Sequence, residues 1–171
     1  HPVDRRQRQM CIRDRTNTPE FGLGSNTFNP VYGKTKNPYD LTRTCGGSSG
    51  GAAVALATRM LSISDGSDMM GSLRNPAAWN NVYGLRPTWG LVPPEPSGEI
   101  FLSQLSTLGP MARSPKDLAL LLDVQANHFD NKSYVLQSKS FWNFTAQPRM
   151  EGIKIGWLGD WGGTLTFEDG L

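Results

Sequence analysis

Two glycine-rich segments hold the residues best suited to chemistry in this 171-residue chain. The first is Gly46-Gly47-Ser48-Ser49-Gly50-Gly51, and the second is Gly71-Ser72, which follows Ser48 by 24 residues. A serine hydroxyl attacks a carbonyl only when a neighbouring group removes its proton. A second serine and a neutral lysine can form that relay, and consecutive backbone N–H groups around residue 72 can stabilise an oxyanion. The pattern therefore favours acyl transfer.

Two other sites fit the same glycines less well. A phosphate-binding P-loop needs Gly-Lys-Ser/Thr, and the glycine-rich segment contains no lysine. The nucleophile elbow of an α/β-hydrolase fits the letters G-x-S-x-G, but it should follow an apolar strand, and here the polar run NPYDLTRTC precedes it. That chemistry also needs a histidine. The chain has only His1, in an arginine-rich leader, and His128, in a polar stretch.

The elements between the two serines explain how they could meet. Ser48 or Ser49 is expected to cap a helix that extends to about Met60. Its small apolar face would pack against a sheet and consists of Ala52, Ala53, Leu56 and Met60. Residues 61–65 are expected to form a strand that turns at Gly66. A helix of about 12 residues travels ~18 Å, and a returning strand would bring the second loop beside the first.

The remaining elements suggest an α/β layer structure. We expect a loop over residues 16–44, a short helix near residues 76–79, extended pieces over 82–94 and an irregular segment over 96–113. Ser114 should cap a helix that starts at Pro115, with Asp117 near its positive end and a well-buried run from Leu118 to Leu122. Residues 128–150 are expected to be a surface excursion. Residues 152–158 alternate like a strand, with Ile153, Ile155 and Trp157 on one face.

Five segments in a consistent order resemble the amidase signature family over about residues 16–160. They are TNTPEFG, GGSSGGAAVALA, GSDMMGSLRNPAAWNNVYGLRPTWGLVP, LGPMARSPKDLALLLDV and GIKIGWLGD. The resemblance implies a mixed β-sheet flanked by helices and amide cleavage by a Ser–cis-Ser–Lys triad through a serine acyl-enzyme. It implies a small-molecule amide as substrate and neither a metal nor an organic cofactor.

The resemblance also assigns roles to individual residues. Ser72 matches the nucleophile, and Ser48 matches the bridging serine, which places a cis peptide bond at Gly47–Ser48. The loop of Met69, Met70, Gly71 and Ser72 matches the oxyanion hole. Supporting positions are Gly47, Ser49, Asp68 and Arg74. Met70 stands where the family usually has glycine, which is compatible with N–H donation if residue 70 needs no positive φ.

The catalytic lysine of the family should lie upstream of this chain, because Lys34 and Lys36 are in the wrong place. We therefore expect residues 16–171 to be a partial amidase signature domain that is inactive by itself. One alternative is an amidotransferase subunit that supplies ammonia for glutamyl-tRNA amidation. Another is a non-catalytic binding or scaffold module.

Charge and composition bear on the chain ends and on partners. Residues 1–15 contain five arginines and two aspartates, and the rest of the chain holds 12 basic and 13 acidic residues. This leader resembles translated sequencing-adapter DNA, so we expect it to be non-native or disordered. It lacks the aromatic residues that stack on bases, so no nucleic-acid partner is expected. No apolar run reaches the ~18 residues of a membrane helix, and a cytoplasmic location is expected. Cys11 and Cys45 cannot form a disulfide framework or a full zinc site by themselves.

Overall fold

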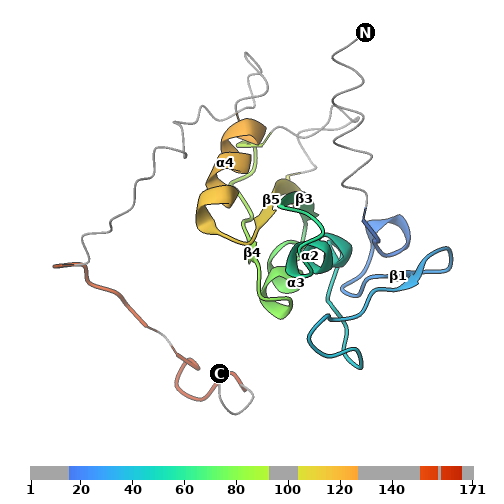
Figure 1. Ribbon diagram of the computed structural model, residues 1–171. Helices are drawn as coiled ribbons and strands as arrows, with labels where there is room; N and C mark the ends of the chain where they lie inside the picture. Colours follow the sequence, from blue (N-terminus) through green and yellow to red (C-terminus); the bar gives the residue numbers. More distant parts are fainter. Residues whose placement is uncertain (1–15, 93–103, 127–150, 158, 167–171) are drawn as a thin grey trace, which may run out of the picture.

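The computed structural model describes residues 16–92, 104–126, 151–157 and 159–166 (Figure 1). The leader 1–15 and the excursion 128–150 therefore lie outside the described residues. The elements in chain order are η1 (Glu20–Gly22), β1 (Phe28–Asn29), β2 (Gly33–Lys34), α2 (Gly50–Ala57), β3 (Ile63–Asp68), α3 (Arg74–Trp79), β4 (Tyr83–Gly84), β5 (Thr107–Ala112) and α4 (Pro115–Ala126). The α/β class is confirmed.

The main sheet of the described residues has the order β3-β5-β4, and both pairings are antiparallel. The register of β3 on β5 runs from Ile63 opposite Ala112 to Asp68 opposite Thr107. Because successive side chains of a strand point to opposite faces, β5 contributes to two layers. Helices α2 and α3 cover one face and α4 packs against the other (Figure 1). A separate pair, β1 with β2, belongs to the loop region over residues 16–44.

Small side chains let α2 lie close to the sheet. The buried cluster on this face consists of Ala52, Ala53, Leu56, Leu73, Ala77 and Met111. The predicted apolar face of α2 is therefore confirmed at three positions and wrong at Met60. The helix ends at Ala57, and Arg59 turns the chain with a φ of 63°, so Met60 is left 76% exposed.

The turn expected at Gly66 is wrong, because β3 continues through this residue to Asp68. A Cβ at position 66 would lie 2.6 Å from Ser49 Oγ and 2.9 Å from Leu73 Cδ2. Glycine in a strand interior often marks such a close approach. Gly66 therefore allows Ser49 and Leu73 to pack closely against the strand, and the chain does not turn there.

The irregular segment expected over residues 96–113 is wrong for residues 107–112. These residues form β5, the central strand of the sheet. The sequence did not indicate this strand because it contains Gly109 and Pro110, and both residue types are disfavoured inside sheets. Pro110 lies opposite Leu85, the residue that follows the two-residue strand β4, and its carbonyl oxygen accepts the Leu85 N–H. Proline is tolerated here because the N–H that it lacks would face a position beyond the end of β4.

The start of α4 agrees with the prediction. The Ser114 hydroxyl accepts a hydrogen bond from the Asp117 N–H at 3.1 Å and donates to the Asp117 carboxylate at 2.7 Å. This arrangement satisfies one of the free N–H groups at the helix start. The expectation of a well-buried run from Leu118 to Leu122 is wrong in part. Leu121 and Leu122 are buried, whereas Leu120 is 38% exposed and Val124, one turn later on the same side of the helix, is 54% exposed.

The expected strand over residues 152–158 is wrong in its described part, residues 152–157. These residues are irregular and exposed, and Ile153, Ile155 and Trp157 are 54%, 70% and 89% accessible. Alternation by itself predicts a strand only when a sheet edge is available for pairing. Within the described ranges, no helix has the length and apolar character needed to cross a bilayer.

Candidate active site

The segment that precedes α2 forms a buried turn. Ser48 and Ser49 are each 6% exposed, and the peptide bond Gly47–Ser48 is cis, as predicted. A Cβ at position 47 would meet the Asn26 backbone nitrogen at 3.0 Å, so the turn lies directly against the loop that contains Asn26. Ser49 precedes the first residue of α2, but its hydroxyl makes no capping hydrogen bond.

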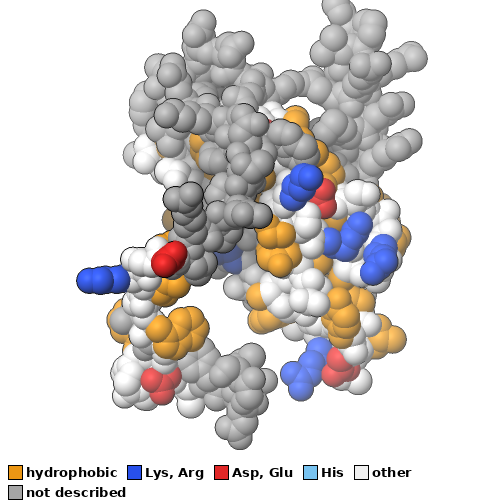
Figure 2. All heavy atoms as spheres, turned by 60° about the vertical axis from the view of Figure 1, so that its left-hand side comes forward, with side chains coloured by type: hydrophobic (Ala, Val, Ile, Leu, Met, Phe, Trp, Pro, Cys, Tyr) orange, Lys and Arg blue, Asp and Glu red, His pale blue; other side chains and the backbone are white. Residues whose placement is uncertain are grey.

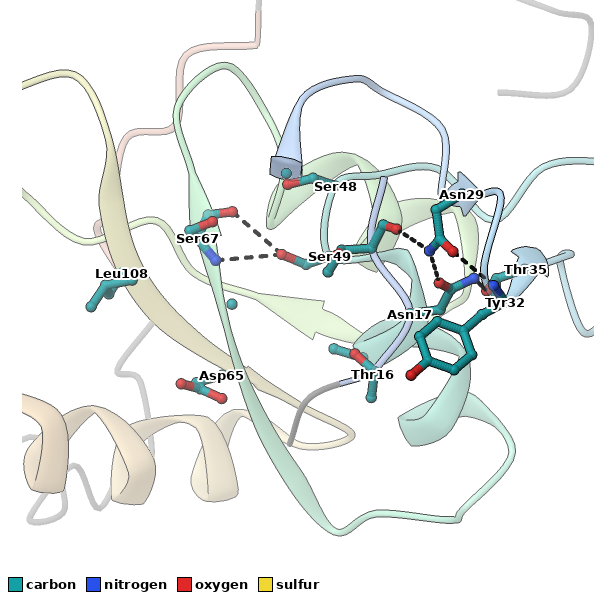
Figure 3. A pocket seen from close by; sticks show the side chains of 14 residues that line it. Thr16, Asn17, Asn29, Tyr32, Thr35, Ser48, Ser49, Asp65, Ser67 and Leu108 are labelled. Atoms are coloured by element: carbon teal, nitrogen blue, oxygen red, sulfur yellow. Dashed lines mark hydrogen bonds between the residues drawn. The ribbon is translucent and has the colours of Figure 1, made fainter. Parts of the chain in front are cut away.

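Ser49 joins the two serine loops instead. Its N–H donates to the carbonyl oxygen of Ser72 at 3.3 Å. Its hydroxyl lies 3.4 Å from both the carbonyl oxygen and the N–H nitrogen of Ser67, in strand β3 (Figure 3). The expected approach of the two loops is therefore present in the structure. The helix and the returning strand bring the backbones at residues 49 and 72 into contact.

Asp68 organises the loop around Ser72. This carboxylate has no exposed surface and accepts the N–H groups of Gly71 at 2.8 Å and Leu73 at 3.2 Å. Arg74 donates to the same carboxylate from Nε at 3.0 Å and from Nη2 at 3.1 Å. Burial raises the pKa of Asp68, but the hydrogen bonds from Arg74, Gly71 and Leu73 outweigh it and leave the pKa below its ordinary value. The residues on both sides of Ser72 are therefore tied to one negative charge.

The loop conformation bears on two of the expected oxyanion donors. Gly71 has a φ of +118°, and Met70 is not among the described non-glycine residues with positive φ. A methionine at position 70 was expected to be compatible with N–H donation if this residue needs no positive φ. This condition is met, because the positive φ occurs at Gly71. The Gly71 N–H already donates to the Asp68 carboxylate. The N–H groups of Met69, Met70 and Ser72 therefore remain as candidate donors to an oxyanion. Met70 is 80% and Met69 46% exposed.

A cavity of about 960 Å³ opens beside Ser48 and Ser49 (Figure 3). Its wall combines hydroxyl groups from three segments of the chain, namely the loop region over residues 16–44, the turn before α2, and β3. Among the lining residues are Thr16, Tyr32, Ser48, Ser49, Asp65 and Ser67. Lys34 and Lys36 are not among the lining residues, and Lys34 is exposed. No cluster of three or more His, Cys, Asp or Glu suited to a metal ion occurs among the residues described.

Several residues that hold the site carried no signal in the sequence. Thr27 is 2% exposed and contacts the turn before α2. The carbonyl oxygen of Asn17 accepts the N–H of Gly51 at 3.2 Å, and its side chain donates to Thr35 Oγ1 at 2.8 Å. Cys45 is buried, and burial raises the pKa of its thiol. Thr27, Asn17 and Cys45 fall in or beside a stretch without apolar periodicity, where only tertiary contacts reveal a role.

Comparison with known proteins gives a consistent result. A family model described as "Amidase" matches residues 6–166. The chain is 43% identical over 146 residues to a protein of Deinococcus deserti that is named as a component of glutamyl-tRNA(Gln) amidotransferase. That match covers 85% of this chain and 30% of the relative.

Solved structures agree with the sequence match. A 6-aminohexanoate cyclic dimer hydrolase superposes with a TM-score of 0.69 at 34% identity, over 77% of this chain and 28% of the hydrolase. A bacterial aryl acylamidase superposes with a TM-score of 0.64 at 36% identity, over 74% of this chain and 26% of that enzyme. The chain therefore spans less than a third of the length of each of these proteins.

Proposed function

Because this chain belongs to the amidase signature family, we propose that it carries the two serines of an amide-cleaving site, with Ser72 as nucleophile and Ser48 as proton relay. The observation that carries the proposal is the hydrogen bond from the Ser49 N–H to the Ser72 carbonyl oxygen at 3.3 Å. This bond fastens the turn of Ser48 to the loop of Ser72, as a relay between their hydroxyls requires. Hydroxyl groups must approach to about 2.6–3.2 Å to exchange a proton.

The proposed reaction has two stages. Ser72 Oγ forms a bond to the amide carbonyl carbon and gives its proton to Ser48 Oγ, while the Ser48 proton passes to an amine base. The N–H groups of Met69, Met70 and Ser72 stabilise the oxyanion. The C–N bond then breaks, the departing nitrogen takes the proton back through Ser48, and ammonia or an amine leaves. Water hydrolyses the resulting ester and regenerates the Ser72 hydroxyl.

Asp68 and Arg74 have a supporting role in this proposal. The carboxylate of Asp68 accepts the N–H groups of Gly71 and Leu73, which flank the nucleophile. It thereby fixes the path of the backbone through residue 72. Arg74 is exposed and pairs with Asp68 from outside. Neither side chain takes part in proton transfer.

The amine base is proposed to be a lysine upstream of this chain, which spans 30% of the length of the Deinococcus deserti relative. Ser48 lines the cavity, so a base that reached into it would lie beside the relay serine. The surface of the described residues supports the same view, because hydrophobic side chains are exposed on it (Figure 2). Phe21, Tyr32 and Met70 are 90%, 79% and 80% exposed. A further part of the fold would cover such side chains. Residues 16–171 by themselves are expected to cleave amides negligibly.

A second candidate is an amidotransferase subunit that supplies ammonia for glutamyl-tRNA amidation. The observation in its favour is the 43% identity to the amidotransferase component from Deinococcus deserti. The two candidates share the acyl-enzyme chemistry of Ser72. They differ in the fate of the released ammonia and in the need for partner proteins. A free-standing hydrolase would release ammonia into solution with no partner and no tRNA present.

The test is amide turnover by the full-length gene product, measured as ammonia release from a panel of primary amides and as p-nitroaniline release from p-nitroacetanilide. Ser72→Ala should lower turnover by about 10⁴-fold or more, and Ser48→Ala by about 10²–10⁴-fold. Ser62→Ala, at an exposed serine before β3, is the matched control and should leave turnover unchanged. Turnover that survives Ser72→Ala, or turnover by residues 16–171 alone that Ser72→Ala abolishes, would refute this mechanism.

A further inference from the structure

The side chain of Thr27 occupies the inside of the turn that carries Ser48. Thr27 lies between η1 and β1 and is 2% exposed. Its hydroxyl donates to the carbonyl oxygen of Gly46 at 2.8 Å and accepts the N–H of Gly50 at 3.1 Å. One hydroxyl group therefore binds the residues at both ends of a five-residue segment, 46–50, with Ser48 at its middle.

We propose that Thr27 is a positioning residue that holds the Ser48 hydroxyl in place for proton transfer. The inference rests on the proposed function and adds to it a residue 21 positions before the relay serine. Thr27 touches neither substrate nor the reacting atoms in this proposal. It acts through the backbone of segment 46–50.

Three further contacts show that this arrangement is specific to the hydroxyl and backbone of Thr27. The Thr27 N–H also donates to the Gly46 carbonyl oxygen, at 3.1 Å, so this oxygen receives two hydrogen bonds from one residue. The Thr27 carbonyl oxygen accepts the N–H of Thr35 at 3.0 Å, which ties the residue to its own loop. A Cβ at position 50 would collide with Thr27 Oγ1, so the hydroxyl fits only against a glycine.

The carbonyl oxygen of Ser48 also lies 3.4 Å from Thr27 Oγ1. The hydroxyl proton goes to Gly46, which is nearer, and the Ser48 carbonyl sits at the limit of hydrogen-bond distance. The loss of the hydroxyl would leave a buried carbonyl and a buried N–H with one partner fewer. Segment 46–50 would then relax, and a shift of about 1 Å at a reacting group can cost ~10²-fold in rate.

The experiment measures the reaction of the full-length gene product with a fluorophosphonate probe, which phosphonylates an activated serine whatever its natural substrate. The site of labelling is mapped to Ser72 by mass spectrometry. Thr27→Val replaces the hydroxyl with a methyl group of similar size. It should lower the maximal labelling rate constant by about tenfold to a hundredfold, with the half-saturating probe concentration within about twofold. Thr27→Ser retains the hydroxyl and should react within about threefold of the wild type. Ser64→Ala removes another buried hydroxyl, 1% exposed, and should react like the wild type.

A double variant separates positioning from stability. If Thr27 acts through Ser48, Thr27→Val should slow the Ser48→Ala protein by less than about twofold, because the relay is already gone. Equal labelling rates for Thr27→Val and the wild type would overturn the inference. A double variant that is slowed by the full product of the two single-variant effects would overturn it as well. If Thr27→Val does not fold by circular dichroism, Thr27→Cys replaces it, since a thiol has similar size and is a weak donor and acceptor. A wild-type protein that is not labelled at Ser72 would refute the proposed function itself, together with this inference.

Discussion

Replacement of Asp68 by asparagine is the sharpest test of the loop that holds the nucleophile. The carboxylate accepts two backbone N–H groups, from Gly71 and Leu73, and has no exposed surface. Asparagine keeps one acceptor oxygen and turns an NH₂ group toward the other N–H donor. One buried N–H then loses its acceptor, which costs about 1–3 kcal/mol. The loss of charge assistance on the remaining bond adds roughly 1 kcal/mol.

The free energy of unfolding should therefore fall by about 2–4 kcal/mol in Asp68→Asn. We assign no share of this loss to Arg74, because its side chain is 52% exposed and such pairs contribute little. The assay is urea denaturation of the full-length gene product followed by tryptophan fluorescence. Labelling of Ser72 by the fluorophosphonate probe should slow as well, because both tethered residues adjoin the nucleophile.

Asp65→Asn is the matched control for this experiment. Asp65 lies on the same strand three residues earlier, but it is exposed, whereas Asp68 has no exposed surface. Substitutions of exposed side chains usually change stability by less than about 0.5 kcal/mol, so a neutral amide at position 65 should be tolerated. A stability loss in Asp68→Asn below about 0.5 kcal/mol, or one equal to that of Asp65→Asn, would refute the reasoning.

Three further outcomes follow from the same contacts. The pKa of Asp68 lies below its ordinary value of 3.8. The stabilising effect of its carboxylate is therefore present above that pH and is lost as the pH falls through the folded-state pKa. Acid titration followed by circular dichroism should show a steeper loss of folded protein below about pH 4 in the wild type than in Asp68→Asn. Gly71→Ala should destabilise the protein by about 1–3 kcal/mol, because a side chain at φ +118° is strained and its Cβ would lie 2.8 Å from Asn75; a melting temperature equal to the wild type would contradict this. In α4, Leu121→Ala should cost about 2–5 kcal/mol and Leu120→Ala less than about 1 kcal/mol, since Leu121 is 6% and Leu120 38% exposed; equal losses in denaturant titrations would show that burial does not set the difference.

Local signals in the sequence were sufficient to predict the helix that starts at Pro115. Ser114, Pro115 and Asp117 lie within four residues of one another, and capping needs only such neighbours. The serines of the site were also identifiable from local context, because glycines surround them and a helix and a strand separate them. The cis bond at Gly47–Ser48 was predicted from the resemblance and is present. The roles of Ser48 and Ser72 in catalysis remain predictions.

Contacts between distant residues decided what the sequence could not show. The strand at residues 107–112 contains Gly109 and Pro110, and it forms because β3 and β4 supply partners on both sides. The face of α4 that is buried depends on where β5 lies, since its leucines run nearly all round the helix.

The interior of the site was decided in the same way. Thr27 reaches Gly46 across 19 positions and Gly50 across 23, and nothing in a loop without periodicity marks it beforehand. Asp68 holds the amides of Gly71 and Leu73 only because β3 ends at a buried point beside the loop. A hydroxyl or carboxylate can satisfy many partners in an unfolded chain, and packing selects one set because a buried polar group left unpaired is costly. The residue types of the site were therefore set by the sequence, and their hydrogen-bond partners by the tertiary structure.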